Sequence, residues 1–280
     1  MAGGGEWMSE KAAPPVELRT DRPHAARVYD VLLGGKTNYP ADRIAAEETL
    51  AALPNAAVIA RQNRSFMHRA ARCLATEAGV RQFLDIGTGI PTSPNLHEIV
   101  QSVLPTARIV YADNDPIVLA HSRALHTSHP EGRTAYIEAD LCDPDSILAD
   151  ETLRRTIDFD EPVALTLVAV LHWLPEGHDP YALVGRILDA FPAGSCLALT
   201  HATHDFEPEA LDEVSTNFRA KGSNVHPRTK EEVTRFFDGL ELLPPGVQVV
   251  QRWRPEPVEV GGEVLGERDI PLYAGVAVKR

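Results

Sequence analysis

The clearest chemical signal lies in small and acidic residues that follow three successive apolar segments. The first segment, QFLDI, runs into Asp85-Ile86-Gly87-Thr88-Gly89, the second ends at Asp113, and the third ends at Asp140. Glycines let the backbone approach a ligand closely, and a carboxylate accepts charge-assisted hydrogen bonds from hydroxyls or amines. Three such segment ends in series indicate a site for a nucleoside-bearing ligand.

The glycine-bearing turn departs from the pattern of dinucleotide-binding proteins. In G-x-G-x-x-G the third glycine allows close packing of helix on strand, but here Thr92 stands at that position after Gly87 and Gly89. This difference counts against NAD and FAD. The next helix is expected to begin near Asn95, where free backbone N–H groups are able to hold a carboxylate.

The second segment end offers a carboxylate for a ribose. Asp113 lies 24 residues after Gly89 and is followed by Asn114. Its two oxygens can accept both ribose hydroxyls, at about 1.5–3 kcal/mol for each bond. Asp115 instead precedes Pro116, which suits a first helical position, so Asp115 is expected to cap the following helix.

Residues at the ends of the third and fourth apolar segments are expected to belong to the same site. Asp140 can accept from the exocyclic amine of adenine, with Leu141 among the apolar neighbours of the ring. The fourth segment continues as Ala169-Val170-Leu171-His172-Trp173, which places an imidazole and an indole beside the cofactor position. His172 is a candidate general base, a cofactor contact, or a structural histidine.

The elements that must position these residues alternate along the chain. From Gln82 onward, short segments rich in β-formers alternate with helix-like segments, which predicts an α/β fold whose parallel sheet has helices on both faces. Two further strands are expected in the tail, VQVVQRW at 247–253 and LYAGVAVKR at 272–280. The carboxyl ends of parallel strands share one edge, so the candidate residues are expected to converge there.

Residues 21–80 read as helices. The longest of them is expected to run from Asn55 to near Gly79, with Asn63 in the middle of its apolar face. Because a buried amide needs a hydrogen-bond partner, Asn63 is a candidate functional residue. A basic stripe lies on the opposite face and is expected to be solvated. Its members are Arg61, Arg64, His68 and Arg72.

With these motifs in place, the chain resembles the class I S-adenosylmethionine-dependent methyltransferases. In closer detail it resembles an actinobacterial family of such proteins, long known as a domain of unknown function. The resemblance covers nearly the whole chain and is carried by RVYDVLLGGKTNYPADR, QNRSFMHRA, QFLDIGTGIPT, VYADNDPIVLAHSRAL, LHWLPE, FPAGSC and GVQVVQRWRP.

The resemblance implies a Rossmann-like fold with a seven-stranded, mostly parallel sheet of order 3-2-1-4-5-7-6 and an antiparallel last strand. The chain is expected to consist of a disordered tail at 1–20, an N-terminal helical segment at 21–80, for which the resemblance implies the role of a lid, and an S-adenosylmethionine-binding domain at 81–280. The cofactor that the resemblance implies is S-adenosylmethionine, held by the residues at the segment ends.

The lid adds further candidates for the same cofactor, of which Tyr29, Gly35, Lys36, Asn63 and Arg64 are the strongest. Tyr29 and Gly34 to Asn38 form a polar, glycine-hinged stretch suited to a lid. The alternative is that Tyr29 and Asn63 hydrogen-bond only within the helical layer. Methyl transfer requires in-line positioning, and it needs a base only for an unactivated acceptor, so no fixed catalytic group is expected.

Charge and composition indicate which partners and which cellular location are expected for the chain. The formal net charge of −13 disfavours nucleic acid, and no apolar run approaches the roughly 20 residues that a membrane helix needs. The start of the chain lacks the plan of a signal peptide and the three cysteines lie far apart, which favours the cytoplasm. His201, His204 and Asp205 have a metal-like spacing without a further ligand nearby, so no metal is expected.

The predicted function is therefore an S-adenosylmethionine-dependent methyltransferase acting on a small-molecule acceptor. Two alternatives remain. One is a nicotinamide-dependent oxidoreductase on a related sheet. The other is a regulatory protein that binds S-adenosylmethionine without turnover.

Overall fold

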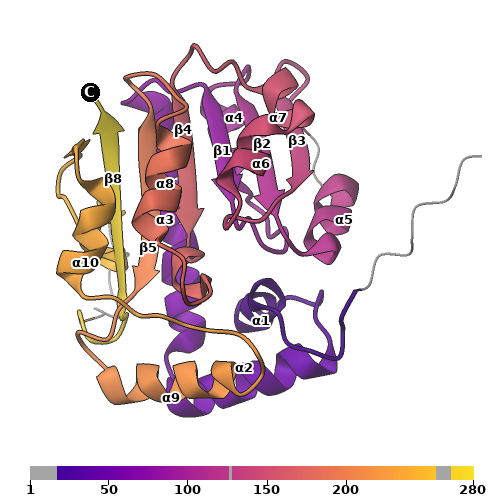
Figure 1. The fold of residues 1–280 in the computed structure, drawn as a ribbon, viewed down its shortest axis with the longest axis vertical. Coiled ribbons are helices and arrows are strands. Elements are labelled where there is room, and N and C mark those ends of the chain that lie inside the picture. The colour runs from indigo at the N-terminus through magenta and orange to yellow at the C-terminus, as the bar shows by residue number, and fades with distance from the viewer. Residues whose placement is uncertain (1–17, 126–127, 257–265) are drawn as a thin grey trace, which may run out of the picture.

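One mixed sheet organises the molecule (Figure 1). The computed structural model describes residues 18–125, 128–256 and 266–280. Among them, eight strands have the order β3-β2-β1-β4-β5-β8-β6, and β7 pairs with β8. The strands are β1 (Gln82–Ile86), β2 (Arg108–Asp113), β3 (Arg133–Glu138), β4 (Val163–Val168), β5 (Cys196–Ala202), β6 (Leu240–Leu242), β7 (Gln248–Val249) and β8 (Leu272–Lys279).

Strands β1 to β5 are parallel, whereas β8 runs antiparallel to β5, β6 and β7. The predicted order is confirmed, with β8 in the place expected for the seventh strand. The register sets Asp85 opposite Tyr111 and pairs Asp113 with Glu138. The ends of β1, β2 and β3 therefore lie side by side at one edge of the sheet.

Helices cover both faces of the sheet because successive side chains of a strand point to opposite sides. In β1, Phe83 packs in the core beneath α3 and α4, whereas Leu84 packs in the core beneath α6, α7 and α8. These helices are α3 (Ala56–Thr76), α4 (Leu96–Val103), α6 (Pro144–Ala149), α7 (Glu151–Thr156) and α8 (Pro180–Leu188). The remaining elements of this part are α5 (Pro116–Leu125), α10 (Lys230–Thr234) and the 3-10 turns η1 (Leu171–Trp173), η2 (Arg235–Phe237) and η3 (Val250–Arg252).

Three helices form a cap beyond the carboxyl ends of the parallel strands, at the bottom of Figure 1. They are α1 (Ala25–Leu32), α2 (Pro40–Ala52) and α9 (Pro208–Arg219). A separate apolar cluster joins them, in which Val28 and Ala46 pack with Phe218. The N-terminal helices thus reach the strand ends together with a helix from much later in the chain.

The tail differs from the prediction in one element. VQVVQRW was expected as a strand, but only Gln248–Val249 pairs with β8, and the chain turns into η3 immediately afterwards. The cause is Trp253, which is fully buried and packs edge-on against Phe66 of α3 at 5.2 Å between ring centroids. The edge strand is instead Leu240–Leu242, which the sequence analysis did not identify.

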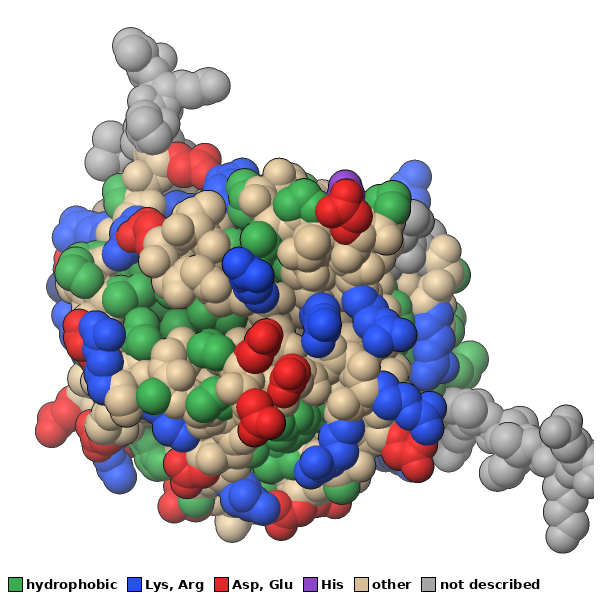
Figure 2. Space-filling model, turned by 90° about the horizontal axis from the view of Figure 1, so that it is seen from above, with side chains coloured by type: hydrophobic (Ala, Val, Ile, Leu, Met, Phe, Trp, Pro, Cys, Tyr) green, Lys and Arg blue, Asp and Glu red, His purple; other side chains and the backbone are tan. Residues whose placement is uncertain are grey.

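No helix in the described part of the chain is long and apolar enough to cross a membrane. Figure 2 shows the end of the molecule opposite the cap, where acidic and basic side chains are interspersed. Of the tail expected at 1–20, residues 1–17 lie outside the described residues.

Candidate functional site

A cavity of about 510 Å³ lies between the carboxyl ends of the strands and the cap. This volume falls within the roughly 300–1,000 Å³ typical of small-molecule sites. Fourteen of the sixteen predicted site residues line it. They are Tyr29, Asn63, Arg64, Asp85, Gly87, Thr88, Gly89, Asp113, Asn114, Asp140, Leu141, Ala169, Val170 and His172.

Two residues, Gly35 and Lys36, are not among the lining residues. The stretch that contains them folds around Asp30, whose carboxylate accepts from the Thr37 backbone N–H and the Asn38 side chain, both at 2.9 Å. A Cβ on Gly35 would lie 2.0 Å from an Asp30 oxygen. The glycine therefore serves a turn at the end of α1, and Gly35 and Lys36 lie outside the cavity that the other predicted site residues line.

The loop after β1 approaches both the cavity and the loop after β4. Gly87 and Gly89 have φ of +74° and +68°, a left-handed conformation that glycine adopts without strain. A Cβ on Gly87 would lie 2.4 Å from a methyl of Val170. Glycine is therefore required at position 87 for two reasons, the left-handed backbone conformation and the close approach of Val170.

Asp113 holds the loops after β1 and β2 together. Its Oδ2 accepts from the Gly89 N–H and its Oδ1 from the Asp115 N–H, both at 2.9 Å. The side chain is 5% exposed, and burial raises the pKa of its carboxyl. Each oxygen retains a second lone pair, and the residue lines the cavity, as a ribose-binding carboxylate needs. Asp115 caps α5 as predicted, because its Oδ1 accepts from the Ile117 N–H at 2.9 Å.

Asp140 lies at the outer part of the cavity and is exposed. Its Oδ1 accepts from the Cys142 N–H at 2.9 Å, which fixes the turn after β3. Leu141 is 5% exposed and belongs to the sheet core. The two residues together present a carboxylate and an apolar surface to the same end of the cavity.

Asp85 is a buried carboxyl at the end of β1. Burial raises its pKa to about 6, although hydrogen bonds from the Thr166 and Thr88 hydroxyls and the nearby Arg64 charge act in the opposite direction. Its pKa therefore lies close to the pH range in which proteins work, and a cationic ligand group beside it would favour the charged form.

The raised pKa predicts a pH-dependent stability difference between the wild type and Asp85→Asn. Between the ordinary value of 3.8 and about 6, the folded protein keeps a proton that the unfolded chain has lost, so stability falls as pH rises. Two pH units correspond to roughly 3 kcal/mol. Urea unfolding measures this difference. Between pH 4 and pH 7, the free energy of unfolding of Asp85→Asn should rise by this order of magnitude relative to that of the wild type. Asp179→Asn, at an exposed helix cap, is the control and should show no comparable gain.

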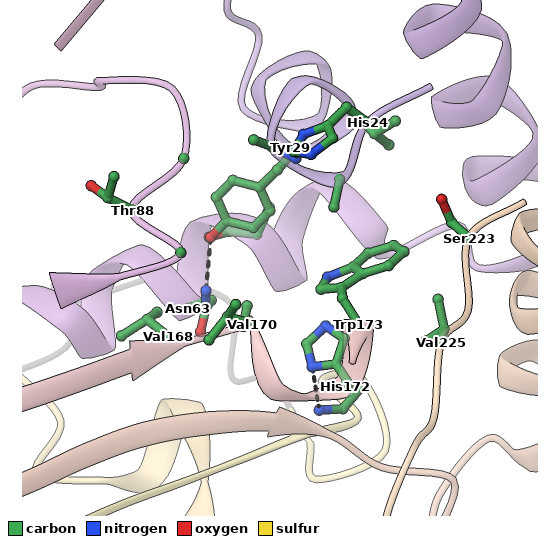
Figure 3. Close-up of a pocket in the computed structure, with 18 of the residues that line it drawn as sticks. His24, Tyr29, Asn63, Thr88, Val168, Val170, His172, Trp173, Ser223 and Val225 are labelled. Carbon is green, nitrogen blue, oxygen red and sulfur yellow. Dashed lines mark hydrogen bonds between the residues drawn. The ribbon is translucent and has the colours of Figure 1, made fainter. Parts of the chain in front are cut away.

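Asn63 and Tyr29 join the cap to the sheet through a continuous chain of hydrogen bonds (Figure 3). The Asn63 side chain donates to the Tyr29 hydroxyl at 2.9 Å and accepts from the Thr200 hydroxyl of β5 at 2.7 Å. The Tyr29 hydroxyl donates to the Ala60 carbonyl at 2.9 Å. Thr200 accepts in turn from the N–H of Ala169, a non-glycine residue with φ +57°. The predicted burial of Asn63 is confirmed, since it is 2% exposed.

Arg64 does not belong to a solvated face of α3. Its Nη2 donates to the carbonyls of Thr92 and Pro94, the latter at 2.7 Å, and thereby ties α3 to the loop before α4. Burial lowers the pKa of its guanidinium. The expectation of a fully solvated stripe is therefore wrong for Arg64, whereas Arg61 and Arg72 are exposed as predicted.

His172 and Trp173 form the wall of the cavity after β4. The His172 Nδ1 accepts from the Ala202 N–H at 3.4 Å, so in the neutral ring the proton is on Nε2. Figure 3 shows this second nitrogen on the side of the ring that faces the cavity. Burial, assisted by the charge of Arg228, lowers the pKa of His172 to about 3. A ring that resists protonation so strongly is a poor general base.

This environment predicts that His172 stays neutral throughout the ordinary pH range. Its ring carbon-bound protons should keep constant NMR shifts from pH 5 to 8, because a group with a pKa near 3 has no proton to gain there. The signals are assigned by comparison with His172→Gln. A midpoint between pH 6 and 7 would show that the imidazole is able to act as a base.

The sequence analysis missed a buried charge cluster between the cap and the loop after β2. Arg27 of α1 lies with its Nε 3.2 Å from Asp115 Oδ2 and its Nη1 3.6 Å from Asp42 Oδ2. The His24 Nδ1 is 3.2 Å from the same Asp115 oxygen. The Arg27 contacts are charge contacts and not aligned hydrogen bonds. The cluster joins three separate parts of the sequence, which gave no local signal that they meet.

Both ring nitrogens of His201, a residue of β5, make contacts within the protein. Its Nε2 lies 2.7 Å from Arg228 Nη1 and its Nδ1 2.8 Å from the Ala202 carbonyl. Asp205 Oδ2 accepts from the Lys230 N–H and the Tyr273 hydroxyl. Neither residue lines the cavity. Among the described residues, no group of three His, Cys, Asp or Glu side chains is placed to hold a metal ion.

Comparison with known proteins shows which family the chain resembles over nearly its whole length. A family model described as S-adenosyl methyltransferase matches residues 11–280. A DUF574 family protein from Streptomyces avermitilis is 47% identical, with a TM-score of 0.91 over 94% of this chain and 100% of its own. A predicted methyltransferase from Thermobifida fusca is 42% identical, with a TM-score of 0.85 over 96% of this chain and 99% of its own. No curated protein matches the chain.

A more distant structure shares the fold alone. The plantazolicin methyltransferase BamL, in a complex that contains S-adenosylhomocysteine, is 12% identical, with a TM-score of 0.50 over 91% of this chain and 96% of its own.

Proposed function

The chain belongs to the S-adenosyl methyltransferase family, and from this premise we propose that it methylates a small molecule enclosed between the strand ends and the cap. S-adenosylmethionine is the methyl donor, and the nicotinamide alternative is set aside. The observation that carries the proposal is the cavity itself, which has a polar end at β1, β2 and β3 and an apolar end beneath α1 and α9.

The residues at the polar end fit S-adenosylmethionine in their chemistry. We assign the ribose hydroxyls to Asp113 and the adenine amine to Asp140, with Asn114 and Leu141 beside the ring. The backbone of Gly87, Thr88 and Gly89 would approach the methionine part. Asp85 suits its ammonium group, and Arg64 is the cation available for its carboxylate. The remaining lining residues in this assignment are Tyr29, Asn63, Ala169, Val170 and His172.

The cap residues position and enclose the reactants. When bound, the cofactor supplies a methyl group on a positively charged sulfur. After the methyl group is transferred, the sulfur is left as a neutral thioether. The chain's task is therefore orientation and exclusion of water rather than the relief of charge on a leaving group. Tyr29 and Asn63 tie the cap to β5 through the Thr200 hydroxyl, and His172 keeps its proton on Nε2 throughout.

A cavity of about 510 Å³ that the cap covers on one side favours a small acceptor over a macromolecule. The cap helices close over the strand ends, and Val28, Val214 and Phe218 of α1 and α9 both pack with one another and line the cavity. A nucleic-acid strand would need an open basic groove, for which the net charge of −13 gives no support.

A transfer screen tests this proposal. The protein is incubated with S-adenosylmethionine labelled at its methyl group and with fractionated cell extract, separated into small molecules, nucleic acid and protein. Label is expected in the small-molecule fraction, and Asp113→Ala should abolish it. Label confined to protein or nucleic acid would contradict the proposal.

A further inference from the structure

The apolar end of the cavity is walled mainly by hydrocarbon, although Thr49, Ser223 and Asn224 of the same cap segments also line the cavity. Six side chains of α1, α3, α9 and the C-cap residue of α2 form this wall: Leu32, Leu53, Ile59, Leu211, Val214 and Phe218. Trp173 completes it, edge-on to Phe218 with 4.8 Å between ring centroids. Such a surface gains free energy from covering an apolar molecule, because apolar area is removed from water.

Two ring N–H donors, those of His172 and Trp173, lie in this wall. His172 donates through Nε2, because its Nδ1 already accepts from the Ala202 N–H. No hydrogen bond to the Trp173 indole N–H is formed by the described residues, and this side chain lines the cavity. The two ring centroids are 5.5 Å apart, and Figure 3 shows both nitrogens on the same side, toward Val170. Two donors that face one space call for an oxygen that accepts hydrogen bonds from both.

The charges around the cavity disfavour a negatively charged acceptor. Arg64 is the one Arg or Lys side chain among the described lining residues, and it is assigned to the carboxylate of the cofactor at the polar end, where it also bonds the Thr92 and Pro94 carbonyls. Both donors at the apolar end are neutral groups. An anion enclosed there would lose its water without gaining a cation, and burial of an unpaired charge is costly.

We propose that the apolar end takes an uncharged, apolar acceptor that carries a hydrogen-bond-accepting oxygen, which His172 Nε2–H and Trp173 Nε1–H orient together. This inference rests on the proposed function, since it names the class of molecule that would be methylated. His172 is thereby a positioning residue that binds the acceptor as a donor and not as a base.

Three probes of nearly equal size test the inference by calorimetry, without any turnover. They are 2-acetylnaphthalene, 2-isopropylnaphthalene, which lacks the oxygen, and 2-naphthoate, which carries a negative charge. Each is titrated into the whole protein saturated with S-adenosylhomocysteine and into the protein alone. We expect the acetyl compound to bind about 10-fold more tightly than the isopropyl compound, because two hydrogen bonds are made. We expect it to exceed the carboxylate by at least as much.

Substitutions then assign the preference to the two donors. His172→Phe and Trp173→Phe should each reduce the acetyl-over-isopropyl ratio to about 3-fold or less, because each keeps the ring and loses the N–H. His172→Gln, which retains an N–H donor, should restore part of the ratio. His204→Phe is the control outside the cavity and should leave the ratio unchanged. A general loss of folding would weaken all three probes and leave their ratios near the wild-type values.

The possible outcomes separate this inference from the proposal on which it rests. Equal binding of the acetyl and isopropyl compounds, tighter binding of the carboxylate, or no binding of any probe up to its solubility limit would overturn the inference. Failure of S-adenosylhomocysteine to bind would count against the cofactor assignment instead, since the probe ratios are measured without it as well.

Discussion

Asp113→Ala is expected to weaken S-adenosylmethionine binding by at least about 100-fold. The carboxylate is buried at the end of β2, and each of its oxygens has a lone pair left after the bonds from Gly89 and Asp115. Two charge-assisted bonds to ribose hydroxyls contribute about 1.5–3 kcal/mol each, and each 1.4 kcal/mol is a factor of about 10 in affinity. Isothermal titration of the two proteins measures the ratio.

A matched control separates ligand binding from the support that Asp113 gives to its loops. Asp179 also accepts from two backbone N–H groups, those of Tyr181 and Ala182, but it is exposed at the start of α8 and outside the cavity. Asp179→Ala should leave the affinity within about twofold, because it removes similar backbone bonds but no cofactor contact. If Asp113→Ala also stayed within twofold, the ribose assignment would be wrong.

Arg27→Met is expected to lower the free energy of unfolding by about 3–5 kcal/mol. Arg27 is 3% exposed and lies between the carboxylates of Asp42 and Asp115, which are equally buried. Methionine keeps the apolar stem, but it leaves two negative charges in the interior without their cation, and such a loss costs about this much. Urea unfolding at pH 7 measures the change.

An exposed ion pair provides the comparison. Arg155 pairs with Glu151 on α7, where the side chains are 76% and 80% exposed. Arg155→Met should change stability by no more than about 0.5 kcal/mol, because solvent screens the pair. A loss of less than about 1 kcal/mol in Arg27→Met would mean that the cap is held by its apolar contacts alone.

The sequence predicts the polar end of the site well, because that end depends on local rules. Glycines and aspartates at the ends of β1, β2 and β3 are fixed by the strand boundaries, and a parallel sheet brings neighbouring strand ends together. Asn63 could be found for a similar reason, since helical periodicity places its amide on the buried face of α3.

The cap and its charges could not be predicted in this way. Asp115 was expected as a helix cap, which uses one of its oxygens, but its second oxygen meets Arg27 only because α1 docks against the loop after β2. In the turn around Asp30, the sequence pattern suggests a glycine hinge. In the structure, Gly35 is instead required by the close approach of the Asp30 carboxylate. Both outcomes depend on tertiary contacts that no sequence period reports.

The segment VQVVQRW illustrates the same limit in the sheet. Its apolar, β-branched composition favours a strand, and two of its residues do pair with β8. Burial of Trp253 against α3 requires the chain to leave the sheet, and Arg69 of α3 secures the new path by donating to the Trp253 and Val250 carbonyls. Packing of one large side chain therefore overrides the local preference.

A crystal structure of the protein with S-adenosylhomocysteine would test the central claim most directly. The account predicts adenosine along the ends of β1, β2 and β3, with its ribose hydroxyls on Asp113 and its sulfur turned toward His172 and Trp173. A ligand bound elsewhere, or one whose ribose lies away from Asp113, would contradict it.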